Sequence, residues 1–219
     1  MAVAAIFDLD GTLVTFNLDI KEWRKVLFDV MKKRGFATGT LTLSTPTQEI
    51  LDYAKDQAGP DNPQAYQSLK SEAFSILDTL ELEGAASATV FPDTTEVLRY
   101  FSTKGVRLGV LTNSGRRAAS ESLRKAGIGD YFEFVLTRDD TETMKPRPEG
   151  LIRAVTLLGV KPADAYYIGD SRYDVEAAKL AGVRSVAVAT GNYSVASLKE
   201  LGADFVITSL SQLKGVLSV

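Results

Sequence analysis

The chain opens on a short apolar run, residues 3–7, that ends abruptly in the polar segment Asp8-Leu9-Asp10-Gly11-Thr12-Leu13. An apolar run of this length, bounded by a glycine, is typical of a buried strand. Because strand side chains alternate with period two, Asp8 and Asp10 are expected to point the same way at its carboxyl end. Like charges placed together are typical of a site that holds a cation, shares a proton or performs catalysis. A solvated turn is the alternative, since acids often precede a glycine in turns.

The following block, residues 16–88, has apolar positions at helical spacing and contains no convincing strand. Gly59-Pro60 separates two of its periodic segments. Helices are predicted over residues 19–35, 46–59 and 62–82. The aromatic residues of the block are interpreted as packing residues of a helical core: Trp23, Tyr53, Tyr66 and Phe74.

After residue 91 the pattern changes to alternating strands and helices. Strands are predicted over residues 106–111, 132–136, 165–168, 184–188 and 205–207. Helices are predicted over residues 93–104, 116–126, 148–158, 173–181, 195–201 and 210–217. Asp93 and Glu96 have the spacing of a helix-capping pair. This alternation predicts an α/β fold with a doubly wound parallel sheet.

The first strand is expected to join the same sheet, although a helical block separates it from the others. Residues 1–15 and 89–219 are therefore predicted to form an α/β core domain, with residues 16–88 inserted as an α-helical cap domain. Because the insertion directly follows the candidate site, it is interpreted as a lid.

The composition limits which nucleophiles and metal ligands the protein can use. The chain has 219 residues, 45% of them hydrophobic, with neither cysteine nor histidine. Disulfides, zinc–thiolate sites, thiol nucleophiles and the Ser-His-Asp triad are therefore excluded. A covalent nucleophile must be Asp, Glu, Ser, Thr, Lys or Tyr, and any metal must be held by oxygen, as Mg²⁺, Mn²⁺ and Ca²⁺ are.

Charge and hydropathy suggest where the protein acts. With 25 basic and 28 acidic residues, a net charge of −3 argues against nucleic acid as a partner. No apolar run has the roughly 18–20 residues that a membrane span needs, and the first residues lack a basic leader. A cytoplasmic enzyme with no membrane partner is expected.

Polar residues follow four of the predicted strands, at the edge where parallel sheets bind ligands. Asp8 and Asp10 follow the first strand, and Thr112-Asn113 follows the second. Lys145 comes after the third strand and its loop, while Asp170 and Asp174 follow the fourth. The sheet thus gathers four carboxylates, a hydroxyl and an ammonium at one edge.

These segments resemble, in order and spacing, the four motifs of the haloacid dehalogenase superfamily of aspartate-nucleophile phosphohydrolases. The matching segments are Asp8-Leu9-Asp10-Gly11-Thr12-Leu13, Leu111-Thr112-Asn113, Lys145-Pro146-Arg147-Pro148 and Gly169-Asp170-Ser171-Arg172-Tyr173-Asp174. The helical block lies where the phosphoglycolate-phosphatase-like branch carries its helical cap. The resemblance covers essentially the whole chain and implies a Rossmann-like core with that cap.

The resemblance implies roles for the residues at the edge of the sheet. Asp8 would attack phosphorus, and Asp10 would protonate the leaving alcohol and then deprotonate the attacking water. The Thr112 hydroxyl and the Asn113 amide would bind the phosphate, while Lys145 would hold Asp8 and the phosphate by its charge.

A Mg²⁺ ion is also implied, with the Asp8 carboxylate, the Asp10 main-chain carbonyl and Asp170 as ligands. Asp174 would act on the metal from a second layer or through water. Helix capping is the alternative role for Asp174, because Ser171 and Asp174 have the spacing of a capping box.

The implied activity is Mg²⁺-dependent hydrolysis of a small phosphorylated metabolite, a phosphoglycolate-like or sugar phosphomonoester, through an aspartyl-phosphate. The acid at position 10 favours phosphate transfer over dehalogenation. Alternatives are a phosphosugar mutase of the same superfamily and a non-catalytic phospho-ligand-binding or signalling module. Four arginines lie beside the motifs: Arg116, Arg117, Arg147 and Arg172. Arg116 and Arg117 would bind a second anionic group, such as a carboxylate, and the alternative is that the arginines are ordinary surface charges.

Overall fold

A six-stranded parallel sheet forms the centre of the larger unit in a computed structural model that describes residues 3–15 and 18–217. The strands are β1 (Ala4–Phe7), β2 (Arg107–Leu111), β3 (Val135–Leu136), β4 (Ala165–Gly169), β5 (Arg184–Val188) and β6 (Phe205–Ile207). Their order is β3-β2-β1-β4-β5-β6, which confirms the predicted doubly wound α/β fold. The strand order reverses between β1 and β4, and ligands bind beyond the carboxyl ends of the strands at such a point.

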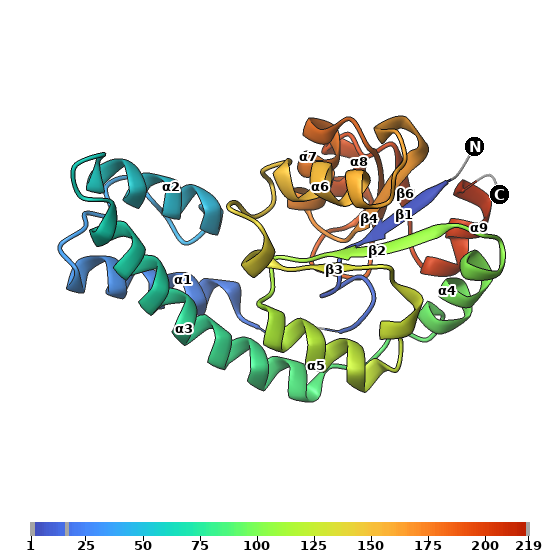
Figure 1. Ribbon diagram of the computed structural model, residues 1–219, viewed down its shortest axis with the longest axis horizontal. Coiled ribbons are helices and arrows are strands. Elements are labelled where there is room, and N and C mark those ends of the chain that lie inside the picture. Colours follow the sequence, from blue (N-terminus) through green and yellow to red (C-terminus); the bar gives the residue numbers. More distant parts are fainter. Residues whose placement is uncertain (1–2, 16–17, 218–219) are drawn as a thin grey trace. The chain divides into compact units, whose positions relative to one another are not determined.

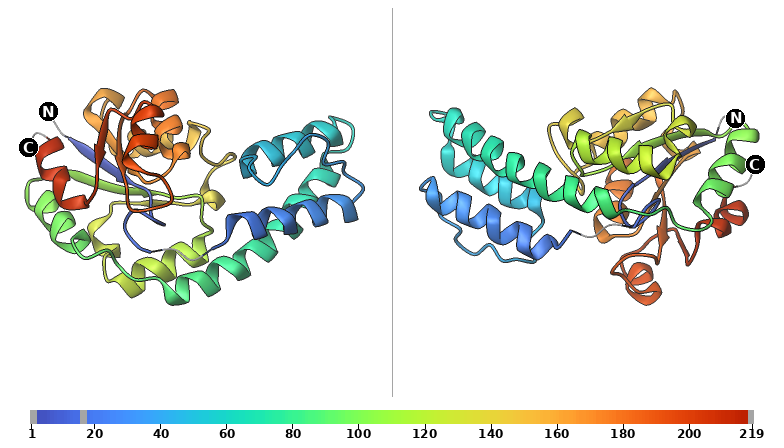
Figure 2. Two further views of the ribbon diagram at one scale, coloured as in Figure 1. Left: turned by 180° about the vertical axis from the view of Figure 1, so that it is seen from behind. Right: turned by 90° about the horizontal axis from the view of Figure 1, so that it is seen from below.

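Helices cover both faces of this sheet (Figure 1). One face packs against α4 (Thr94–Thr103), α5 (Arg116–Ala126) and α9 (Leu213–Val216). The other packs against α6 (Glu149–Leu157), α7 (Arg172–Ala181) and α8 (Val195–Glu200), and the views of Figure 2 show the same layers. Short 3₁₀ turns lie at Gly129–Tyr131, Arg138–Asp140, Pro162–Asp164 and Leu210–Gln212.

Burial on both faces explains why β1 is apolar along its whole length. Ala5 and Phe7 belong to the core on the α4 and α5 side, whereas Ala4 and Ile6 belong to the core on the α6 side. A strand covered on both faces loses the alternation of apolar and polar residues seen in half-exposed strands. The same arrangement places the polar residues after Phe7 at the end of a rigid, buried strand.

A second unit consists of α1 (Ile20–Lys33), α2 (Thr47–Ala58) and most of α3 (Pro63–Ser87), and the chain rejoins the first unit at Ala85. Trp23 and Tyr66 are buried, as predicted for packing residues, and Tyr53 and Phe74 are half-buried. No helix in the described part of the chain combines the length and apolar character needed to cross a membrane.

Some local predictions were wrong. Asp93 makes no capping bond, because its carboxylate accepts a hydrogen bond from the Ser211 N–H at 2.7 Å. Glu96 pairs instead with Lys214 at 2.6 Å. Both partners come from the last turns of the chain, which the local spacing could not reveal. The predicted strand at 132–136 is shorter, because the Phe132 N–H still closes the preceding turn on Gly129.

Candidate active site

Three carboxylates meet at the carboxyl edge of the sheet. Asp8 directly follows β1, Asp170 directly follows β4, and Asp174 lies in the first turn of α7. Each offers an oxygen within 4.8 Å of the other two. The Asp8 N–H donates to Ile168 O at 2.8 Å, which fixes the end of β1 against β4. Parallel pairing of β1 with β4 therefore brings together acids that are far apart in the sequence.

Lys145 supplies the positive charge of this cluster. Its Nζ lies 2.8 Å from Asp8 Oδ1 and 2.7 Å from Asp174 Oδ1, and the residue is only 7% exposed. Burial opposes the charged form of Lys145, but Asp174 and Asp8 raise its pKa above the usual range. Burial also raises the pKa of Asp8 well above its usual range, while Lys145 opposes that rise. The ammonium thus stays charged and favours the ionised form of Asp8.

Asp174 is held by donors at both of its oxygens. Oδ1 accepts from Lys145 and from the Tyr167 hydroxyl at 3.1 Å. Oδ2 accepts from the N–H of Ser171 at 3.0 Å and from its hydroxyl, so the capping box is present as well. Four donors match the roughly four acceptor sites of a carboxylate. Asp174 is therefore well suited to orient Lys145 towards Asp8.

Asp10 lies beside this cluster, partly exposed at the edge of the sheet. The Ser114 hydroxyl donates to its Oδ2. Burial of the carboxyl raises the pKa of Asp10 to about 6, while hydrogen bonding by Ser114, the Lys145 charge and hydrogen bonding by Thr112 lower it. A carboxyl with a pKa in this range can both give and take a proton near neutral pH.

The loop between β2 and α5 carries Thr112 and Asn113. Thr112 is buried, and its Oγ1 accepts from the Ser114 N–H at 3.1 Å. The Asn113 side chain donates to Lys145 O at 3.1 Å and accepts from Lys145 N–H at 2.9 Å. This pair of bonds, which the sequence did not reveal, fixes the backbone that carries the Lys145 ammonium.

Asp170 is enclosed by the loop that follows β5. A Cβ on Gly191 would lie 1.8 Å from Asp170 Oδ2, so only glycine allows this close approach. The Thr190 hydroxyl donates to Gly11 O at 2.6 Å and ties the same loop to the segment after β1. Burial and the Asp174 charge raise the pKa of Asp170 to about 7. A partly buried carboxylate beside other carboxylates is a suitable ligand for a cation.

Two of the four arginines beside the motifs, Arg116 and Arg172, have partners within the same unit. The Arg116 guanidinium donates to Asp140 Oδ1 at 2.6 Å, and its side chain is largely exposed. The Arg172 guanidinium lies over the Tyr173 ring, 5.0 Å from the centroid. The interpretation of Arg116 as a surface charge therefore fits its surroundings.

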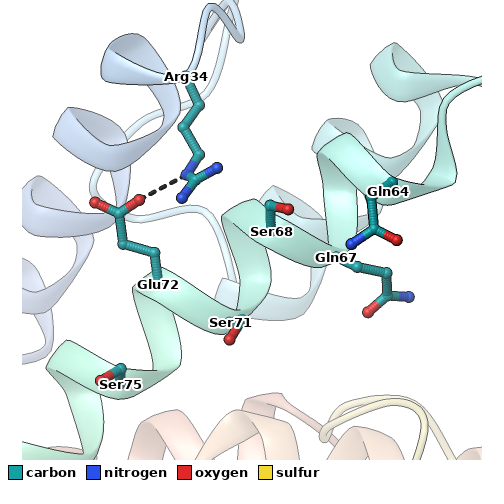
Figure 3. Close-up of a pocket in the computed structure, with 7 residues that line it drawn as sticks. All are labelled: Arg34, Gln64, Gln67, Ser68, Ser71, Glu72 and Ser75. Carbon is teal, nitrogen blue, oxygen red and sulfur yellow. Dashed lines mark hydrogen bonds and ion pairs between the residues drawn. The ribbon is translucent and has the colours of Figure 1, made fainter.

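The helical unit has a polar hollow of about 530 Å³ (Figure 3). It is lined by Arg34, Gln64, Gln67, Ser68, Ser71, Glu72 and Ser75. Arg34 Nε donates to Glu72 Oε2 at 2.6 Å, so these opposite charges neutralise each other. The hollow lacks the clustered carboxylates found at the sheet edge, and it is not the candidate active site.

Residues 5–188 match the family described as haloacid dehalogenase-like hydrolase. The chain belongs to this family. The match spans the segments that carry Asp8, Asp10, Thr112, Lys145, Asp170 and Asp174, and the predicted superfamily is confirmed.

The chain aligns over most of its length with two relatives. Phosphoglycolate phosphatase from Nitrosococcus oceani is 34% identical over 216 residues, which cover 97% of this chain and 95% of the relative. Pyrophosphatase PpaX from Bacillus cereus (strain AH820) is 32% identical over 215 residues, again covering 97% and 95%. The predicted enzyme class, a phosphatase of this family, is confirmed.

Solved structures share the fold of this haloacid dehalogenase-like chain. A family hydrolase from Deinococcus radiodurans R1 has a TM-score of 0.64 at 24% identity, covering 99% of this chain and 95% of the other. A Thermotoga maritima protein named "putative beta-phosphoglucomutase" has a TM-score of 0.61 at 25% identity, covering 99% and 98%.

Proposed function

We propose that this protein is a Mg²⁺-dependent phosphatase that hydrolyses a small phosphate monoester through an aspartyl-phosphate on Asp8. The observation that carries the proposal is the buried Asp8 carboxylate, paired with Lys145 at 2.8 Å next to Asp170. A buried carboxylate that lies beside a charged ammonium group, at the end of a rigid strand, is placed to act as a nucleophile.

In the first half-reaction an Asp8 oxygen forms a bond to phosphorus while the bond from phosphorus to the leaving oxygen breaks. Asp10 gives its proton to that oxygen, and the alcohol departs. In the second half-reaction Asp10 takes a proton from water as the water oxygen attacks phosphorus. The bond from phosphorus to Asp8 breaks, releasing inorganic phosphate and restoring both carboxyl groups.

The donor set fits Mg²⁺. The three clustered groups are carboxylates, and hard cations such as Mg²⁺ prefer oxygen ligands. We assign Asp8, Asp170 and the Asp10 main-chain carbonyl as ligands, with Asp174 acting on the metal from a second layer because four donors already occupy its oxygens. When bound, the ion neutralises charge between carboxylate and phosphate.

The residues after β2 and β3 would hold the phosphate. We assign this role to the Thr112 hydroxyl, the Asn113 backbone amide and the Lys145 ammonium. Because Lys145 is buried, its attraction to a phosphoryl oxygen is screened less than that of a surface lysine. We assign residues 16–88 as a cap that restricts access to the site. The cytoplasm is its proposed location.

Phosphate monoesters are the proposed substrates, with phosphoglycolate first because of the Nitrosococcus oceani relative. Pyrophosphate is the second candidate, since the Bacillus cereus relative is named a pyrophosphatase. Alcohols leave far less readily than phosphate does and need proton donation more. An acid whose pKa is about 6 at position 10 therefore favours the monoester.

Phosphate release will test the proposal. We expect inorganic phosphate from a panel containing phosphoglycolate, sugar phosphates and pyrophosphate in the presence of Mg²⁺, and none after EDTA treatment. Restoring Mg²⁺ should restore turnover. Turnover that persists in EDTA would contradict the metal dependence, and interconversion of sugar phosphates without phosphate release would identify a mutase.

Substitution of Gly191 by Ala should weaken binding of Mg²⁺ by about 10- to 100-fold, because the new methyl group must displace the Asp170 carboxylate. Isothermal titration of the purified protein with Mg²⁺ measures the change. Gly215→Ala is the matched control, since a Cβ at Gly215 meets no atom within 4 Å. An unchanged Kd in Gly191→Ala would show that Asp170 does not hold the ion.

A further inference from the structure

We propose that Ser114 is a positioning residue that holds the Asp10 carboxyl in the orientation required for proton transfer to the leaving group. This inference rests on the proposed function, because it assigns to Asp10 the role of acid and base. Ser114 lies outside the residues that the sequence motifs single out, in the loop between β2 and α5.

Each polar group of Ser114 has a partner in the site. Its hydroxyl donates to Asp10 Oδ2, and its N–H donates to Thr112 Oγ1 at 3.1 Å. Its carbonyl accepts from the Arg138 N–H at 3.2 Å. Ser114 is only 6% exposed, so water has little access to compete for these bonds. The hydrogen bonds of the Ser114 backbone therefore fix the direction in which its hydroxyl points, towards Asp10.

The 3₁₀ turn Arg138–Asp140 makes hydrogen bonds that hold this loop in place. Arg138 is buried, and its Nη1 lies 3.3 Å from Asn113 O. The Asp139 carboxylate accepts from the Arg116 N–H at 2.8 Å, at the start of α5. Contacts on Asn113, Ser114 and Arg116 hold the loop on both sides of the Ser114 hydroxyl, as a preorganised site requires.

The hydrogen bond also selects one oxygen of Asp10. Because the Ser114 hydroxyl donates to Oδ2, that oxygen accepts a hydrogen bond from Ser114, which fixes the rotation of the Asp10 carboxyl. Thr112 also hydrogen-bonds the Asp10 carboxyl, and loss of the Ser114 donor would weaken the restraint on its orientation.

The experiment compares two substrates of similar shape whose leaving groups differ, phenyl phosphate and p-nitrophenyl phosphate. In Ser114→Ala, kcat/KM on phenyl phosphate should fall about 10- to 100-fold, the range expected for a lost hydrogen bond to a charged group. On p-nitrophenyl phosphate, kcat/KM should fall less than about threefold, because this ratio covers the steps up to departure of the leaving group and nitrophenolate leaves without a proton. The second half-reaction, in which Asp10 acts as a base, is common to both substrates and does not enter this comparison.

A double mutant tests whether Ser114 acts through Asp10. On phenyl phosphate, Asp10→Asn with Ser114→Ala should be no slower than Asp10→Asn alone, since the shared role is already lost. Ser114→Cys, which keeps a weak donor, should fall between wild type and Ser114→Ala. Ser122→Ala removes another buried serine hydroxyl, on α5, and should match wild type.

If Ser114→Ala lowered kcat/KM by the same factor on both substrates, the role of Ser114 would be overturned. The same would hold if the losses in the double mutant added to those of Asp10→Asn. Thermal unfolding of each variant separates these outcomes from a general loss of structure. If the proposed function is wrong, the result is different: Asp10→Asn itself would lower kcat/KM by the same factor on both substrates.

Discussion

Substitution of Asp8 by Asn is expected to lower kcat by about 10⁴-fold or more, the largest loss at any position. The amide keeps the shape of the side chain but cannot form the bond to phosphorus. Phosphate release measures the loss. In wild type, turnover in water enriched in ¹⁸O should leave labelled phosphate and unlabelled Asp8, because water attacks phosphorus and not the carboxyl carbon.

Asp130→Asn is the matched control for this substitution, because Asp130 is an exposed aspartate on the same unit and should tolerate the change. If Asp8→Asn kept more than about a tenth of wild-type turnover while correctly folded, water would have to attack the substrate directly. The covalent intermediate would then be wrong even though the enzyme hydrolyses phosphate.

The sequence predicted that Asp8 and Asp170 lie together because their positions depend mainly on sheet topology, whereas the role of Lys145 was implied by the family resemblance. Asp8 and Asp170 directly follow strands, and a parallel pair brings the ends of both strands to one edge. The apolar run before Asp8 indicated a buried strand because residues on both of its faces lie in the core. No knowledge of side-chain packing was needed for this part.

The contacts that support the site could not be predicted from the sequence, because each joins segments far apart in the chain. Ser114 meets Asp10 across 104 positions, and Thr190 meets Gly11 across 179. The same limitation made the Asp93 capping prediction wrong, since its partner Ser211 lies 118 positions away. Such contacts depend on how loops pack, and neither propensity nor spacing along the chain encodes that.

Lys145→Met tests whether the buried ammonium stabilises the fold as well as the reaction. Methionine keeps the length of the side chain but leaves the Asp8 and Asp174 carboxylates without their shared cation. Removing one partner of a buried ion pair typically costs about 3–5 kcal/mol, so the metal-free variant should be less stable by that amount at pH 8. Its kcat should fall about 10²- to 10³-fold, as expected when a fixed charge is lost.

The stability loss should depend on pH in a way that identifies its cause. Lys145 lowers the pKa of Asp8, so its removal lets burial raise that pKa further. The variant can then relieve the unpaired charge by protonating Asp8, and its deficit in unfolding free energy should shrink as pH falls from 8 towards 5. The wild-type ammonium stays charged throughout this window because the two carboxylates raise its pKa.

Urea denaturation at both pH values, without Mg²⁺, measures this difference. Lys161→Met, at an exposed position, is the control and should change stability little at either pH. A deficit of the same size at pH 5 and pH 8 would mean that lost packing destabilises the variant. A deficit that narrows at low pH would mean that the unpaired carboxylates do so, and that Lys145 is the charge that lets Asp8 remain ionised within the core.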